Sequence, residues 1–298
     1  ARRGIIIAAT EHKAALNASL QCQEFFNSEV HVLGVNALGL IDIDDLERAL
    51  ETGKFGLVVV MSANNETGVI QDSQAIAEVA HKYGAFYLCD LTQSVGKEDV
   101  RVRLSHADLA VMSGHKIYGP KGSGVLFATR EAQNSIAPLF GGGGQERGLR
   151  GGTPNTVSAV GLAEALKRAT SQVQNLSKLY ESLAIEFRDG LAVAGIEVEE
   201  IGEGARRLPN TINARFIGID AEILMANMPS VEVSTGSACN SAVVESSHVL
   251  LAHGLSVAEA NECIRFSFGK DTTVADIAIT VREIAQAVER IRQIELAG

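Results

Sequence analysis

The chain has 298 residues, of which 46% are hydrophobic, and a formal net charge of −10 at pH 7. This length and apolar content suffice for one large domain and a smaller one. An acidic surface repels phosphate backbones, which argues against direct binding of nucleic acid. No apolar run reaches the ~20 residues that cross a bilayer, so we expect no membrane partner.

Short apolar runs alternate with amphipathic stretches through the first half of the chain. Residues 4–9 are predicted to form a strand and residues 13–26 a helix. The apolar run at 57–61 is typical of a parallel strand buried on both faces, and a helix capped by Asp72 or Ser73 follows it. Further strands are predicted at residues 86–89, 109–112 and 124–128. This alternation predicts an α/β fold with a doubly wound, mostly parallel sheet covered by helices.

The second half of the chain has a different pattern. Apolar residues recur at spacings of three and four from Leu162 to Phe187, which predicts one long amphipathic helix or two abutting ones. A similar stripe runs from Val274 to Ile294. We therefore expect a large domain over residues 1–170 and a smaller C-terminal α+β domain over residues 171–298.

The four cysteines are widely spaced and form no CxxC pair. This spacing argues against a metal site and a disulfide scaffold, so we expect a reducing, cytoplasmic compartment. Cys22, Cys89 and Cys263 fall in predicted helices or strands, as buried thiols usually do. Cys239 stands instead among small polar residues at 237–241, which is typical of an exposed loop.

Polar residues follow three of the predicted strands. They are found at residues 64–66, at Asp90 and Gln93, and at residues 113–116. In open parallel sheets the ligand crevice lies outside the carboxyl ends of the strands. Ordinary loop polarity explains one such cluster equally well, but three together favour a single ligand site.

Lys116 follows a buried strand and has Ser113 and His115 beside it. A lysine that forms a Schiff base must lose its proton, and a confined site favours the neutral amine. Ser113 and His115 are able to hydrogen-bond a phosphate. The alternative is a solvated loop lysine.

Asp90 ends an apolar strand, where an unpaired carboxylate is costly. A protonated pyridine nitrogen would serve as its partner, and the pairing would make the ring a better electron sink. Gln93, three residues further on, is placed for a ring hydroxyl. The alternatives for Asp90 are a helix cap or a salt bridge.

Residues 113–122 (Ser-Gly-His-Lys-Ile-Tyr-Gly-Pro-Lys-Gly) resemble the cofactor-lysine motif of cysteine desulfurases. These enzymes form the NifS-like and IscS-like group of the class V aminotransferase family, with the type I fold of enzymes that use pyridoxal 5'-phosphate (PLP). The resemblance runs over essentially the whole chain, and its motifs keep their order and spacing. The other matching motifs are at residues 10–13, 64–68, 90–97, 143–153, 234–239 and 264–267.

The resemblance implies a cofactor site with PLP as a Schiff base on Lys116. His12 would stack on the ring and help move protons, Asp90 would pair with the ring nitrogen, and Gln93 would contact the ring oxygen. Ser113 and His115 are the residues implied to bind the phosphate. As a lone histidine, His12 also fits a helix cap.

The resemblance also implies residues for the substrate and the partner subunit. Asn65 and Arg265 would hold the carboxylate of L-cysteine, for which the planar fork of an arginine is suited. Thr153 would reach the phosphate of a neighbouring subunit, which implies a homodimer. The alternatives are a structural ion pair for Arg265 and, for Thr153, the start of the helix after Pro154.

Cys239 distinguishes this family from other PLP enzymes of the same fold. The resemblance implies that Cys239 takes sulfur from L-cysteine as a persulfide, that L-alanine is released, and that the sulfur passes to an acceptor protein. The acceptor would be an iron–sulfur scaffold or a thiolation protein, in iron–sulfur cluster assembly, tRNA thiolation or DNA phosphorothioation. Residues 245–250 match the branch with a longer cysteine loop, whose mobility would let one thiol reach both cofactor and acceptor.

The sequence departs from the family pattern at two places. Leu91 stands where the family has a small alanine against the PLP ring, so we expect crowding of the ring. The segment that precedes residues 10–13 in the family is missing, so we expect an N-terminally incomplete chain with part of the phosphate grip absent. The alternatives to a desulfurase are an aminotransferase, a selenocysteine lyase, or a truncated inactive chain that acts as a binding protein.

Overall fold

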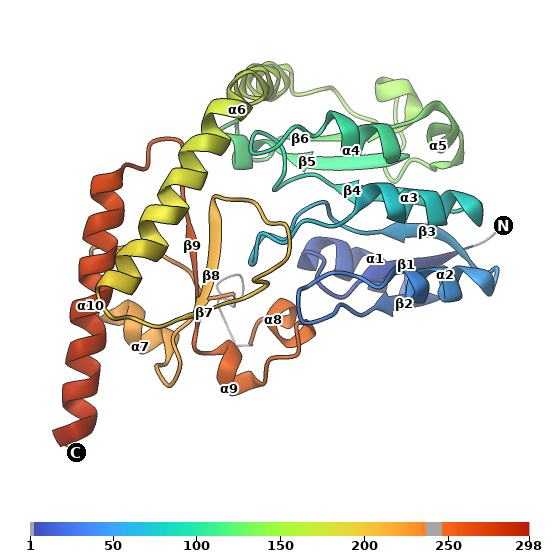
Figure 1. The fold of residues 1–298 in the computed structure, drawn as a ribbon. Helices are drawn as coiled ribbons and strands as arrows, with labels where there is room; N and C mark the ends of the chain where they lie inside the picture. The colour runs from blue at the N-terminus through green and yellow to red at the C-terminus, as the bar shows by residue number, and fades with distance from the viewer. Residues whose placement is uncertain (1–2, 237–245, 298) are drawn as a thin grey trace.

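Two sheets form the framework of this chain in a computed structural model that describes residues 3–236 and 246–297 (Figure 1). The larger sheet has the order β2-β1-β3-β4-β5-β6, and the smaller one the order β7-β8-β9. The strands are β1 (Gly4–Ala8), β2 (Val30–Leu33), β3 (Phe55–Val59), β4 (Phe86–Asp90), β5 (Leu109–Ser113), β6 (Gly124–Ala128), β7 (Glu199–Glu200), β8 (Thr211–Arg215) and β9 (Cys263–Ser267).

Helices fill most of the chain between these strands. They are α1 (Lys13–Phe26), α2 (Ile43–Glu51), α3 (Ser73–Lys82), α4 (Arg101–His106), α5 (Arg130–Ser135), α6 (Thr156–Val193), α7 (Ala221–Ala226), α8 (His248–Ala252), α9 (Val257–Ala260) and α10 (Val274–Ala297). Short 3₁₀ helices occur at η1 (Gly114–Ile117) and η2 (Gln145–Gly148). No helix among the described residues is long and apolar enough to cross a membrane.

The larger sheet is parallel from β2 to β5, and β6 pairs with β5 in the antiparallel sense. Side chains on β1 alternate between two cores, because successive residues of a strand face opposite sides. Ile6 packs with α2 and α3, whereas Ile5 and Ile7 pack toward α1. The predicted doubly wound, mostly parallel sheet is therefore confirmed, although the sequence did not indicate β2 or α2.

Polar side chains set the start of the helices on this sheet. Asp42 accepts two backbone N–H bonds at the beginning of α2, and Asp72 does the same at α3, as predicted. His12 begins α1, where its Nδ1 accepts from the backbone N–H of Ala14 at 3.1 Å. These caps hold the carboxyl ends of the neighbouring strands in a fixed relation to the helices.

A single helix, α6, joins the two sheets. Leu162 packs in the core of the larger sheet, and Leu183 and Phe187 pack in the core of the smaller one together with α10. The helix changes direction part-way along, which Figure 1 shows as an upper part seen end-on and a lower part beside α10. Thr170 and Ser171 bond carbonyls three or four residues back, a contact that bends helices.

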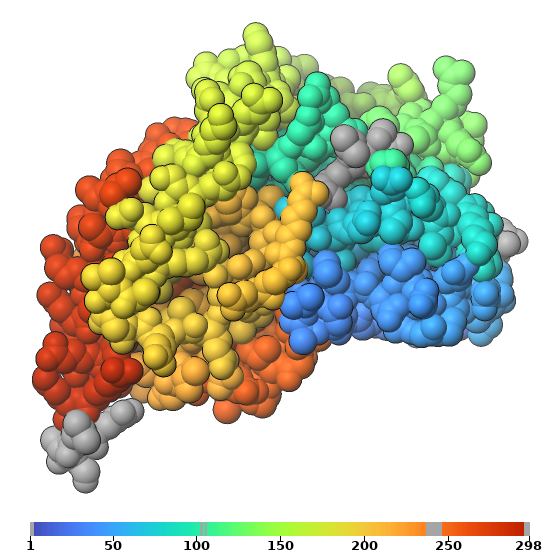
Figure 2. Space-filling view, in the orientation of Figure 1, coloured from blue at the N-terminus to red at the C-terminus, as the bar shows by residue number. Residues whose placement is uncertain are grey.

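The long predicted helix is thus confirmed as one continuous element of 38 residues. The predicted domain boundary at residue 170 falls inside it, and the division of the chain into two folding units stays a prediction. Figure 2 shows the two parts side by side, with the blue-to-cyan residues of the larger sheet and its helices on the right and the orange and red residues of the smaller sheet and its helices toward the left.

Candidate active site

A cavity of about 1000 Å³ lies where the carboxyl ends of β3, β4 and β5 meet α6 and β9. Eight of the predicted site residues line it: His12, Asn65, Asp90, Gln93, Ser113, His115, Lys116 and Arg265. The structure therefore brings the three polar clusters together, as the parallel sheet requires. Thr153 is exposed and lies outside the cavity lining, and Cys239 lies outside the described residues.

Lys116 stands on the tight turn η1, directly after β5. A Cβ atom on Gly114 would lie 2.4 Å from the Ser123 hydroxyl, so the turn needs glycine at this position. The Ser113 hydroxyl and the Nδ1 atom of His115 lie 2.7 Å apart. The Lys116 side chain is exposed to the cavity and forms no hydrogen bond with a described residue, so its amine is available to a ligand.

Asp90 is held by the turn that ends β4. Its Oδ1 atom accepts from the backbone N–H of Thr92 at 2.8 Å, and both residues line the cavity. Leu91 points the other way: it is 3% exposed, packs in the core of the larger sheet, and does not line the cavity. The expected crowding of the ring by Leu91 was therefore wrong, and Thr92 holds the cavity-facing position.

His12 both caps a helix and faces the cavity, the two roles that its sequence position suggested. Its Nδ1 atom caps α1 through the N–H of Ala14, and its ring lines the cavity. Because Nδ1 accepts a hydrogen bond, the remaining Nε2 atom is the one that carries the proton in the neutral ring. A fixed ring orientation is suited to stacking on a planar ligand.

Arg265 reaches the cavity from β9 and meets the loop after β3. Its Nη1 atom donates to the backbone carbonyl of Asn65 at 3.2 Å. The Nε atom of Arg265 and the Oδ1 atoms of Asn65 and Asn210 are buried and have no partner among the described residues. Such orphaned polar atoms are costly, and a polar ligand would satisfy them.

The cavity carries positive charge in an acidic protein. Asp90 is the only carboxylate among its described lining residues. The basic side chains there are Lys97, Lys116, Arg168, Arg265 and Lys270. Arg168 and Lys270 pair with carboxylates outside the lining, Glu164 and Asp271, so the uncompensated charge comes from the other three. Burial, followed by the charges of Lys116 and Arg265, lowers the pKa of Lys97 to about 8. This charge pattern suits an anionic ligand.

These residues fit PLP. Ser113 and His115 offer hydrogen bonds to its phosphate, Asp90 offers a carboxylate to the ring nitrogen, and the amine of Lys116 has no hydrogen-bond partner in the described part of the chain. The positive potential suits the phosphate and the ring oxygen. The geometry therefore supports the cofactor set that the sequence predicted.

Glu11 is a buried carboxylate beside the cavity, outside its lining, that the sequence did not reveal. It is fully buried, its Oε1 atom accepts from the Met61 N–H at 2.5 Å, and its Oε2 atom has no partner among the described residues. Burial, and then the charge of Asp90, raises the pKa of Glu11 well above its usual range. Asp90 remains the one carboxylate among the described residues that line the cavity. The signal in the sequence was a carboxylate two residues after the strand predicted at residues 4–9.

Glu66 lies between the two described ends of the segment that contains Cys239. The Ser247 hydroxyl donates to Glu66 Oε2 at 2.5 Å, and a Cβ atom on Gly236 would lie 2.3 Å from the same oxygen. Burial raises the pKa of Glu66. Ser234, two residues before Gly236, pairs with Arg265 through two backbone hydrogen bonds. The described chain before residue 237 therefore lies beside the cavity.

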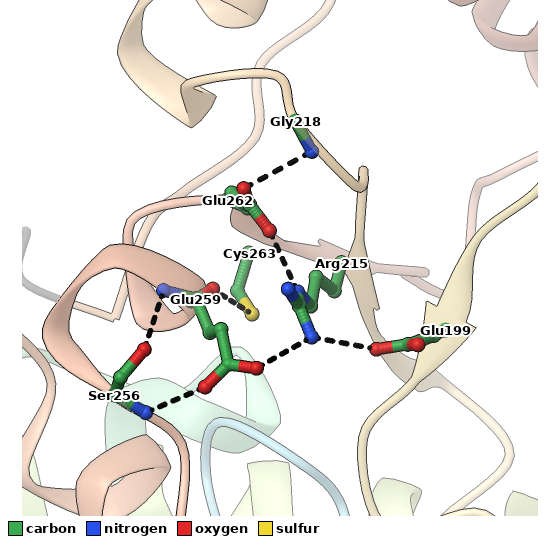
Figure 3. A network of polar contacts seen from close by, with 7 residues as sticks. All are labelled: Glu199, Arg215, Gly218, Ser256, Glu259, Glu262 and Cys263. Atoms are coloured by element: carbon green, nitrogen blue, oxygen red, sulfur yellow. Dashed lines mark hydrogen bonds and ion pairs between the residues drawn. The ribbon is translucent and has the colours of Figure 1, made fainter.

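A second polar cluster surrounds Arg215 at the outer end of the smaller sheet (Figure 3). Its guanidinium pairs with Glu262, Glu199 and Glu259 at 2.7, 2.9 and 3.0 Å. Cys263 donates its thiol to the Glu259 carbonyl, and burial raises the pKa of Cys263 to about 12. These groups satisfy one another, so the cluster is structural and Cys263 is an inert thiol.

Comparisons with known proteins agree with this site. A model of the family "Aminotransferase class-V" matches residues 1–279. The chain is 39% identical to the cysteine desulfurase of Frankia sp. (strain EuIK1), over 98% of this chain and 72% of that protein. It is 37% identical to the cysteine desulfurase IscS of Escherichia coli O139:H28 (strain E24377A / ETEC), over 97% and 71%.

Comparison with solved structures points to the same group of proteins. The X-ray structure of the NifS-like protein from Rickettsia africae ESF-5 matches with a TM-score of 0.83 and 29% identity, over 96% of this chain and 76% of that one. Family, relatives and fold agree with the lysine, aspartate and arginine gathered in the cavity. This chain therefore belongs to the class V aminotransferase family, within its group of PLP-dependent cysteine desulfurases.

Proposed function

We propose that this desulfurase converts L-cysteine to L-alanine and passes the sulfur through Cys239 to an acceptor protein. The observation that carries the proposal is the single cavity in which Lys116, Asp90 and Arg265 meet. The lysine holds a cofactor, the aspartate tunes it, and the arginine selects a carboxylate. The curated relatives of the chain support the reaction itself.

In this proposal PLP is held by the residues that fit it. Lys116 carries the cofactor, Ser113 and His115 bind the phosphate, Asp90 pairs with the ring nitrogen, and Gln93 contacts the ring oxygen. When bound, PLP withdraws electrons from the α-carbon of the substrate. His12 stacks on the ring from the N-terminal end of α1 and exchanges a proton at Nε2.

The substrate is oriented by the opposite wall of the cavity. Arg265 binds the carboxylate of L-cysteine with its guanidinium, and the side-chain amide of Asn65 donates to the same group. The amine of Lys116 would remove the α-proton of the substrate. Arg265 and Asn65 would hold the substrate by its carboxylate.

Cys239 takes the sulfur. Its thiolate attacks the sulfur of the substrate, so that an S–S bond forms as the Cβ–S bond breaks. The electron pair of the broken bond stays on carbon, which is protonated and leaves as alanine. The sulfur on Cys239 is then a persulfide, and an acceptor such as an iron–sulfur scaffold or a thiolation protein collects it.

Homodimer assembly and a cytoplasmic location belong to the same proposal. Thr153 is exposed outside this cavity, which is consistent with a role in the site of a neighbouring subunit. Cys22, Cys89 and Cys263 form no disulfide within the described part of the chain, as is usual in a reducing compartment.

The experiment is a PLP spectrum and an alanine-release assay on wild type, Lys116→Ala and Cys239→Ser. Wild type is expected to gain a visible band and release alanine from L-cysteine. Lys116→Ala loses the band of the lysine-bound cofactor and the activity, and Cys239→Ser keeps the band but loses activity by about 100-fold or more. Cys22→Ser, a half-buried cysteine in α1, is the matched control and keeps both. Undiminished alanine release by Cys239→Ser would refute the role of Cys239.

A further inference from the structure

Lys97 is a lysine of the cavity wall that the reaction described above does not use. It follows Gly96, a residue with φ of +78°, in the turn after β4, and its side chain is partly buried. Its Nζ atom donates to the backbone carbonyl of Gln93 and to Oε1 of the Gln93 side chain, both at 2.9 Å. No carboxylate of the described residues pairs with it.

These contacts fix the side-chain amide of Gln93. An ammonium group only donates hydrogen bonds, so the atom that faces Lys97 must be the amide oxygen. The two ends of a glutamine amide are otherwise hard to tell apart, and here the lysine decides between them. The Nε2 atom of Gln93, with two N–H donors, therefore remains for the cavity and has no partner among the described residues.

The surroundings of Lys97 match an anion rather than a protein carboxylate. Lys116 on η1 and Arg265 on β9 face it, and both add positive charge. Arg168 of α6 lines the same cavity, and Asp90 is the one described carboxylate there. The chain has thus placed a partly buried cation where no side chain of the described residues neutralises it, which is costly without a ligand.

We propose that Lys97 is a positioning residue that locks Gln93 with its N–H donors toward the ring oxygen of the bound cofactor. A charge-assisted pair holds the amide, and the amide in turn donates to an oxygen that carries negative charge. Lys97 also adds its own charge to the potential at that oxygen. This inference rests on the proposed function, because it takes PLP as the ligand.

The test is a pH titration of the visible band of the PLP-loaded protein. Positive charge near the nitrogen that joins PLP to Lys116 disfavours its protonation, so Lys97→Met is expected to move the midpoint up by about 0.5–1 pH unit. Lys97→Arg keeps a donor and a charge, so the midpoint of this variant should lie close to that of wild type. The matched control Lys54→Met, at a surface lysine paired with Glu29, leaves the midpoint unchanged.

A double variant separates positioning from charge alone. Gln93→Ala is expected to raise the midpoint as well, and Lys97→Met with Gln93→Ala should give less than the sum of the two shifts, because both act on one hydrogen bond. A sum that is strictly additive, or an unshifted Lys97→Met, would overturn the inference while leaving the proposed function intact. Absence of the band in wild type would instead reject the proposed function.

A second measurement needs no cofactor. In PLP-free protein the NMR resonances of the Gln93 side-chain amide are expected to titrate with Lys97, with a midpoint near its pKa of about 8. Lys97→Met should remove this titration, and thermal unfolding of the same sample verifies that the variant is folded. Gln93 amide signals that stay constant across this pH range in wild type would contradict the contact.

Discussion

The Arg215 cluster and the cavity treat positive charge in opposite ways. Arg215, at the C-terminal end of the central strand β8, meets three carboxylates within 3.0 Å. In the cavity, Lys97, Lys116 and Arg265 share a single described carboxylate. A cation that its own chain neutralises is part of the architecture, whereas cations that pair with no described carboxylate leave a charge for a ligand to neutralise.

The same contrast applies to the cysteines and carboxylates. Cys263 is buried beside carboxylates that Arg215 holds, so its thiol stays protonated and inert. Glu11, in contrast, is buried with no described cation paired to it, and this burial, with the nearby charge of Asp90, raises its pKa. In the Arg215 cluster each charge is compensated by its neighbours. In the cavity, charge is concentrated on a few groups that face a ligand, as a reaction at one bond requires.

Exchanging the cation in the cavity should have the largest effect. Arg265→Gln is expected to lower kcat/KM for L-cysteine by about 100-fold, mostly through KM, because a charged contact of this kind is worth about 2–4 kcal/mol. Steady-state alanine release measures it. Arg215→Gln is the matched control and keeps KM, so equal loss of activity in the two variants would abolish the distinction between the regions.

Removing the cation of the Arg215 cluster should act on stability. Arg215→Ala leaves Glu199, Glu259 and Glu262 facing one another without a counter-charge, and we expect the free energy of unfolding to fall by about 2 kcal/mol. Urea unfolding measures the change. Arg206→Gln removes a single exposed pair with Glu98 at 3.4 Å and should change stability by less than about 0.5 kcal/mol; losses of equal size would remove the case for a network.

Glu11→Gln should have the smallest effect of the three, a change in how the free energy of unfolding depends on pH, and the sign of this change can be predicted. The unfolded chain releases the Glu11 proton at a pKa of about 4.3, whereas the folded chain keeps it to higher pH. Between the two values the folded state binds more protons, so its stability falls as pH rises. Glutamine has no proton to lose, so the variant should gain on wild type by up to about 1.4 kcal/mol per pH unit.

Urea unfolding of Glu11→Gln and wild type at pH 5, 6 and 7 tests this sign. The difference in unfolding free energy should grow steadily with pH in favour of the variant. Gln74→Glu, on the exposed face of α3, serves as the reverse substitution on the surface and should give a nearly flat difference. A pH-independent difference for Glu11→Gln would mean that Glu11 is ionised in the folded protein.

Much of the fold and most of the candidate site could be predicted from the sequence. Asp90 and Lys116 follow apolar strands, and parallel strands bring their carboxyl ends to one edge, so strand order was not needed to place them together. The spacing of three and four likewise predicted helix over residues 162–187, as one helix or two, and α6 is one helix that extends beyond this range at both ends.

Other features depend on geometry that no local pattern encodes. The orientation of Leu91 is set by the turn after β4, which sends its side chain into the core and Thr92 to the cavity. The contact between Lys97 and Gln93 requires that turn as well, and the neutral state of Glu11 follows from its burial. The role of Cys239 stays a prediction.

The continuity of α6 limits which insertions and deletions this chain can accept. One unbroken helix serves as a wall of the cavity and as the spine of the smaller sheet, with Ala169 and Leu176 facing the cavity and Phe187 the second core. Each residue added to a helix turns everything after it by about 100° and advances it by 1.5 Å. A single insertion between Ala169 and Leu176 would therefore rotate and shift the smaller sheet, and Arg265 with it, relative to Lys116. The number of residues in this helix, more than their identity, thus keeps Arg265 and Lys116 at one cavity.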